Sequence, residues 1–166
     1  MDNKSKCSEA QMLIRKSVNE VYNAFIDPML TKNFWFTKGS GKLEIKKEIV
    51  WTWDMYNFSA KVIATQIIPD KKIEFDWFTN DKPTFVTIDF IELNLNATFV
   101  SIIHHGFDKT GDELIEILKD STGGFTLVLA GLKAYLEHGI NLNLVADKYP
   151  IELTNHEEEL KNRSSS

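Results

Sequence analysis

The chain has 166 residues, of which 43% are hydrophobic and 26% are charged, a balance that is typical of one soluble domain. Its net charge of -5 disfavours nucleic acid as a partner, because phosphate binding requires an excess of Lys and Arg. The one cysteine, Cys7, excludes an intrachain disulfide and suits a reducing compartment, so we expect a cytoplasmic protein. No window approaches the ~20 apolar residues that span a bilayer.

A strand and two short helices are predicted first along the chain. Residues 10–15 are predicted to form the strand. Ser17 and Glu20 match a capping box, in which each side chain accepts a hydrogen bond from a backbone N–H at a helix start. We therefore expect a helix to begin at Val18 and to end before the next proline. The apolar segment 29–36 is compatible with a second short helix.

Between residues 39 and 107, hydrophobic and polar residues alternate with the period of β-strands. The links carry Asn, Asp or Pro at each reversal, which favours consecutive antiparallel neighbours over helical crossovers. We expect a meandering antiparallel sheet. The strands predicted for it are 42–46, 48–54, 58–67, 72–78, 84–93 and 98–107.

Helical periodicity returns after Gly111, where we expect a short helix at 112–119 and a longer one that begins near 121–125 and ends at Gly139. The longer helix carries an apolar stripe that must be buried. The apolar face of the sheet is the only large surface that the stripe could cover, which predicts an α+β layered fold. The pair Gly123 and Gly124 is predicted to let this helix start close to the sheet.

Four aromatic side chains occupy alternate positions of two predicted strands, with Trp51 and Trp53 in one and Phe75 and Trp77 in the other. Each pair therefore projects from one face of its strand, while the flanking residues are polar. This face is the predicted ligand-binding wall. Packing within the core stays an open alternative, because burial stabilises a large aromatic side chain in either role.

Several segments resemble the activator of heat-shock-protein-90 ATPase branch of the START-like superfamily, also called SRPBCC or birch-pollen-allergen-like. They are 14–25 with Trp35 and Phe36, 62–77, 102–107 and 123–139, within a match that spans 12–139. The resemblance implies a helix-grip fold, in which a curved antiparallel sheet of about six strands wraps around a long C-terminal helix. It departs from the family where Phe125 replaces the usual Trp, and where Gly39-Ser40-Gly41 replaces paired glycines.

The resemblance also predicts how the chain is organised. Residues 10–140 would form the single helix-grip domain, with two short helices near its N-terminus. Residues 1–9 would be a tail and 141–166 a C-terminal extension. The last part of that extension, from residue 155, is expected to be disordered, because its glutamates and serines bury little apolar area.

The same resemblance implies a hydrophobic cavity between the sheet and the long helix, which the superfamily uses for lipids, sterols, polyketides and other apolar molecules. We therefore expect a small hydrophobic or aromatic ligand, no cofactor, and a monomer or homodimer. A chaperone is the alternative partner, and the family name implies a role in modulating its ATPase. The predicted pocket residues are Trp35, Trp51, Trp53, Phe75, Trp77, Ile88, Phe90, Ile102, His104, Phe125 and Leu129.

His104 is the best candidate for a polar anchor or proton carrier in that pocket. No metal site is expected there, because His104 and His105 face opposite sides of a regular strand. The segment 156–159 lacks the second histidine of a zinc-binding helix. A cyclase or hydrolase is the third alternative, and it requires a second polar group beside His104. No catalytic residue is predicted, and an enzyme is less favoured than a binding protein.

Overall fold

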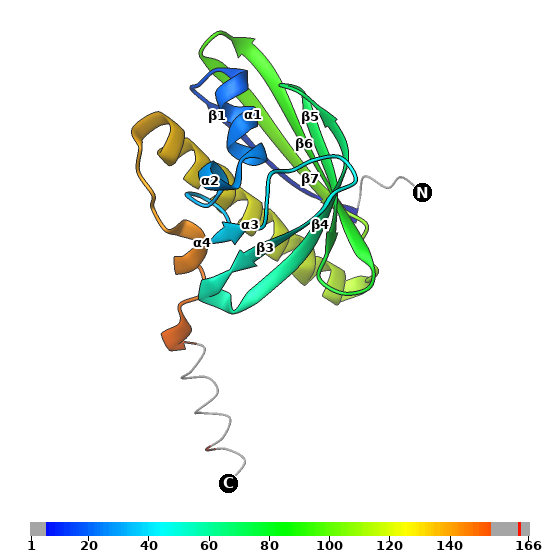
Figure 1. Ribbon diagram of the computed structural model, residues 1–166. Coiled ribbons are helices and arrows are strands. Elements are labelled where there is room, and N and C mark those ends of the chain that lie inside the picture. The colour runs from blue at the N-terminus through cyan, green and yellow to red at the C-terminus, as the bar shows by residue number, and fades with distance from the viewer. Residues whose placement is uncertain (1–5, 154–162, 164–166) are drawn as a thin grey trace.

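The computed structural model describes residues 6–153 and residue 163, and these form a seven-stranded antiparallel sheet with a long helix, α3, across its concave face (Figure 1). The strand order is β1-β7-β6-β5-β4-β3-β2, so neighbours from β2 to β7 follow the chain. The strands are β1 (Ser8–Ile14), β2 (Lys38–Gly39), β3 (Glu48–Trp53), β4 (Phe58–Ile68), β5 (Lys72–Phe78), β6 (Pro83–Asn94) and β7 (Ala97–His105). The helices are α1 (Val18–Ile26), α2 (Pro28–Thr31), the 3-10 turn η2 (Asp54–Tyr56), α3 (Gly111–His138) and α4 (Leu144–Asp147). The predicted helix-grip fold is confirmed.

The predicted capping box starts α1. The Ser17 hydroxyl accepts a hydrogen bond from the Glu20 backbone N–H, and the Glu20 carboxylate accepts one from the Ser17 N–H, both at 3.3 Å. The helix begins at Val18, as predicted. The second helix, α2, is one turn and shorter than the segment 29–36, and it begins at Pro28. The chain then turns inward, and Trp35 is only 5% exposed.

The strand predicted at 42–46 is wrong. This segment is a loop with one isolated bridge, between Ile45 and Ala64, and the two-residue strand β2 pairs with β3 in its place. The alternation in the sequence was misleading because only Leu43 points inward, whereas Ile45 is 51% exposed. At the N-terminus, β1 already begins at Ser8, so the predicted tail 1–9 is too long.

The two helices predicted after residue 111 are one continuous helix, α3. Gly123 and Gly124 lie inside it and keep ordinary helical geometry, so they do not interrupt it. A Cβ at Gly124 would meet open space, so the predicted close approach to the sheet is also wrong. The helix makes a close approach at Gly131 instead, and to the segment after α2 rather than to the sheet, because a Cβ there would lie 3.2 Å from the Cβ atom of Phe34.

The apolar stripe of α3 is buried as predicted, with Phe125, Val128, Leu129 and Leu132 at most 6% exposed. None of the helices in the described part of the chain is long and apolar enough to cross a membrane. The expected disordered tail from residue 155, including 156–159, lies outside the described residues apart from residue 163.

Candidate functional site

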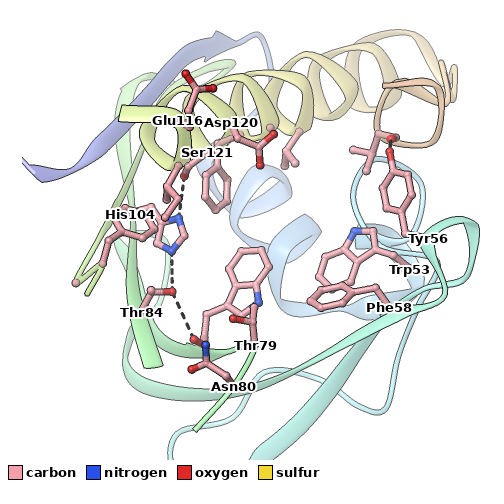
Figure 2. A pocket seen from close by; sticks show the side chains of 18 of the residues that line it. Trp53, Tyr56, Phe58, Thr79, Asn80, Thr84, His104, Glu116, Asp120 and Ser121 are labelled. Carbon is pink, nitrogen blue, oxygen red and sulfur yellow. Dashed lines mark hydrogen bonds between the residues drawn. The ribbon is translucent and has the colours of Figure 1, made fainter. Parts of the chain in front are cut away.

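A cavity of about 920 Å³ lies between α3, the concave side of the sheet and the C-terminal extension (Figure 2). Pockets for small molecules typically measure roughly 300–1,000 Å³, so its size suits a ligand. Its aromatic lining comprises Trp35, Trp53, Tyr56, Phe58, Trp77, Phe107, Phe125 and Tyr149. Its neutral polar lining includes Thr79, Asn80, Thr84, His104 and Ser121.

Of the predicted pocket residues, Trp35, Trp53, Trp77, His104 and Phe125 line this cavity. The other six, which are at most 4% exposed, lie in the packed core: Trp51, Phe75, Ile88, Phe90, Ile102 and Leu129. Aromatic side chains from the N-terminal part of the chain fill the space over them. The Phe36 ring stacks on Trp51 at 4.9 Å between centroids, and the rings of Tyr22 and Phe25 contact Phe90.

Near-parallel rings form one wall of the cavity. The Trp53 and Trp77 rings are inclined by 4° with centroids 5.8 Å apart, and the Trp77 and His104 rings by 16° at 5.7 Å. Phe125 packs edge-on against Trp35, Trp77 and His104. The buried Trp77 indole nitrogen has no hydrogen-bond partner among the described residues. This wall is therefore largely apolar, and the Trp77 indole N–H is a buried donor without a partner in the described part of the chain.

His104 is held by hydroxyl groups on both sides. Its Nδ1 lies 2.8 Å from the Ser121 hydroxyl oxygen of α3, and its Nε2 lies 2.8 Å from that of Thr84 in β6. Ser121 also bonds the Ser8 hydroxyl at 2.7 Å. Figure 2 shows His104 between Ser121 and Thr84, across the cavity from Trp53, Tyr56 and Phe58. The cavity thus has a polar end and an aromatic end.

Burial of the imidazole lowers the pKa of His104 from 6.5 to about 4, and the neighbouring His105 adds to this effect. His104 is therefore neutral at neutral pH, with one ring nitrogen as a donor and the other as an acceptor. His105 faces the other side of the sheet, where its ring contacts Phe85. Among the described residues, no group of three His, Cys, Asp or Glu side chains could hold a metal ion.

The C-terminal extension contributes a wall that the sequence analysis missed. Val145, Lys148 and Tyr149 line the cavity. The Tyr149 hydroxyl donates to the Asp120 carboxylate on α3 at 2.5 Å, and the Tyr56 hydroxyl donates to the Val145 carbonyl. The extension thus connects η2 to α3 across one side of the cavity. The apolar residues of this extension, which was predicted without a role in the pocket, were the available signal.

Six charged side chains line the cavity, and all but Lys148, which is 24% exposed, are more than half exposed, so we call the rim that they form the cavity mouth. They are three lysines and three carboxylates: Lys82, Lys109, Lys148, Asp108, Glu116 and Asp120. Each forms an ion pair, including Lys82 with Asp108 at 2.5 Å and Lys148 with Asp120 at 3.4 Å. The pair with Lys82 lowers the pKa of the Asp108 carboxyl and raises that of the Lys82 ammonium. The formal charges of these six groups therefore sum to zero.

The family described as Activator of Hsp90 ATPase homolog 1-like protein matches residues 15–137, more than half of the chain. The chain belongs to this family. The predicted resemblance is confirmed, and the matched segment contains both the sheet strands β2 to β7 and nearly all of α3. It ends before the extension that supplies Val145, Lys148 and Tyr149 to the cavity.

Solved structures share the fold. Protein SSP2350 from Staphylococcus saprophyticus is 27% identical with a TM-score of 0.71, over 82% of this chain and 95% of that one. The Aha1 dimer from Colwellia psychrerythraea is 20% identical with a TM-score of 0.67, over 80% and 97%. PFC0360w, an HSP90 activator from Plasmodium falciparum, is 18% identical with a TM-score of 0.64, over 80% and 96%. No curated protein matches the chain.

Proposed function

We propose that the protein binds a small hydrophobic or aromatic molecule in the cavity beneath α3. The observation that carries this proposal is a cavity of about 920 Å³ with aromatic walls and a single hydrogen-bonded imidazole at one end. An apolar cavity without a guest forfeits packing contacts along its lining. A ligand would restore those contacts, and His104 with its hydroxyl partners would orient it. A cytoplasmic location is also proposed, since one cysteine suits a reducing compartment.

Native mass spectrometry of freshly purified protein tests this proposal most directly, because a retained guest would appear as a mass above that of the chain. A thermal-shift screen of hydrophobic ligands complements it, and we expect saturable stabilisation. Absence of both a retained guest and a saturable response would contradict the proposal.

Two tryptophans of the same strand provide a matched pair of variants. Trp53 lines the cavity, whereas Trp51, 1% exposed, lies in the core behind it. We expect Trp53→Phe to weaken ligand binding, because the smaller ring leaves part of the wall uncovered. Trp51→Phe should lower the free energy of unfolding without a comparable loss of affinity. Equal losses of affinity in both variants would indicate a general packing defect.

A catalytic use of the same pocket has weaker support. The second polar group that a cyclase or hydrolase requires is present, because Ser121 and Thr84 both bond His104. However, a pKa of about 4 makes His104 a weak proton acceptor at neutral pH, and both its nitrogens are already engaged. These features favour an anchor for the ligand over a general base.

Modulation of a chaperone ATPase is the second candidate function. Membership of the family and the fold shared with an HSP90 activator favour it. An exposed apolar group at the β6–β7 hairpin provides a surface for a partner, with Ile91 50%, Leu93 57% and Leu95 80% exposed. Stimulation of an Hsp90 ATPase by the purified chain, reduced in Leu93→Ser, would support this candidate. No stimulation at saturating protein would exclude it.

A further inference from the structure

We infer that the cavity selects neutral aromatic molecules with one hydroxyl, carbonyl or amide group over carboxylates of the same shape. This inference rests on the proposed function, because it names the ligand class of the same site. It follows from the distribution of charge around the cavity and from the hydrogen bonds of its polar end.

Among the lining residues that the structure describes, the aromatic wall carries no cation, and the least exposed lysine, Lys148 at 24%, is already paired with Asp120. Trp35, Trp53, Trp77 and Phe125 are apolar apart from indole N–H groups. His104 is neutral at pH 7 because burial lowers its pKa to about 4. A carboxylate that enters loses its water shell without gaining a free counter-charge, so it should bind more weakly than a neutral molecule of the same shape.

The mouth of the cavity cannot compensate for this cost. Its three lysines and three carboxylates balance in sign, and each already has an ion-pair partner. Five of these six side chains are 53–77% exposed, so water and salt screen them strongly, and the sixth, Lys148, is 24% exposed and is neutralised by Asp120 at 3.4 Å. The mouth therefore offers no net field that attracts an anion or a cation.

The polar end can bond a neutral group. The Thr84 hydroxyl donates to the Trp77 carbonyl and bonds His104, and the Ser121 hydroxyl bonds both Ser8 and His104, so each keeps one acceptor position for a donor of the ligand. Thr79 and Asn80 lie on the same side of the cavity as Thr84 (Figure 2). A hydroxyl or amide N–H of a ligand could donate to these two oxygens, and the side-chain NH2 of Asn80 could donate to a ligand carbonyl.

The wall of aligned rings, which runs from Trp53 through Trp77 to His104, determines the body of the ligand. The rings of Trp53, Trp77 and His104 are inclined to their neighbours by only 4° and 16°. Aligned ring planes favour offset-stacked or edge-on contact with another flat ring. A planar aromatic body with its polar group directed to Thr84 therefore satisfies both ends of the cavity.

Isothermal titration calorimetry at pH 7.5 with 2-naphthamide, 2-naphthol and 2-naphthoate tests the inference. The amide and the carboxylate are nearly isosteric and differ in charge. We expect 2-naphthamide to bind at least about tenfold more tightly than 2-naphthoate, which corresponds to roughly 1.4 kcal/mol. Equal or tighter binding of 2-naphthoate overturns the inference but leaves a ligand-binding cavity. Failure of all three to bind overturns the inference and counts against the proposed function.

Two variants at the mouth provide a matched control with opposite charge changes. Asp108→Asn removes the counter-ion of Lys82 and adds one positive charge to the mouth. Lys82→Gln removes the counter-ion of Asp108 and adds one negative charge. We expect the ratio of naphthoate to naphthamide affinity to rise about two- to threefold in Asp108→Asn and to fall in Lys82→Gln, since exposed charges contribute weakly. A ratio that moves in the same direction in both variants contradicts control of selectivity by charge.

Discussion

The neutral state of His104 makes the stability of the protein depend on pH in a defined window. The pKa of His104 is about 4 in the folded protein and 6.5 for an unperturbed histidine. Because the folded-state value is lower, the unfolded chain binds a proton between these values that the folded protein does not. The stability associated with neutral His104 is complete above pH 6.5 and is lost as the pH falls towards 4.

The size of this effect follows from the two pKa values. Between pH 7.5 and pH 5.0, the free energy of unfolding should fall by about 2 kcal/mol through His104 alone. For a domain of this size, that loss corresponds to a decrease in Tm of roughly 4–8 °C. Urea unfolding at the two pH values measures it directly.

A variant that does not titrate isolates His104 from the carboxylates, which also respond to acid. In His104→Gln the side chain keeps one donor and one acceptor but has no charge change in this range. We expect this variant to be less stable at pH 7.5 and to lose about 2 kcal/mol less than the wild type on acidification. His105→Gln, on the outer side of the sheet, should retain most of the wild-type pH dependence.

Two results would refute this reasoning. The first is an equal loss of stability in the wild type and in His104→Gln between pH 7.5 and 5.0. The second is an NMR titration in which the His104 ring protons change near pH 6.5, because that would show an imidazole in contact with water.

Three further changes test separate parts of the fold. Gly131→Ala should destabilise by about 1–3 kcal/mol in urea unfolding, because its Cβ would lie 3.3 Å from the Phe34 carbonyl oxygen, whereas Gly124→Ala should stabilise by up to about 1 kcal/mol. Equal effects of the two would contradict the close packing at Gly131. Ser17→Ala should cost about 1 kcal/mol in the same assay through loss of the capping box, and a neutral result would count against that cap. Tyr149→Phe removes a hydrogen bond to α3 and should speed amide exchange over 144–149; unchanged exchange would show that this bond does not hold the extension.

The amino-acid sequence determined the elements whose signals are local. Ser17 and Glu20 lie three residues apart, so they specify the start of α1 without help from the rest of the chain. Alternation located β4 to β7 to within about two residues, because one face of each strand must be buried. The apolar stripe of α3 likewise indicated a helix that covers the sheet.

The cavity depended on contacts between segments that lie far apart in the chain. Trp51 and Trp53 share one strand face, yet Phe36 stacks on Trp51 and leaves Trp53 to line the cavity. The extension was assigned no role because its hydrogen bonds, such as Tyr149 to Asp120, join residues 29 positions apart.

The environment of His104 likewise depends partly on local sequence and partly on contacts between distant segments. His104 pairs with Val86 across β7 and β6, which places Thr84 two residues along on the same face. Ser121 reaches the ring from α3, 17 residues away in the chain. The alternation of residues in β7 was enough to predict that His104 faces inward, because that pattern depends only on neighbouring residues. Only the strand register and the position of the helix could bring both hydroxyls to its ring and keep it neutral.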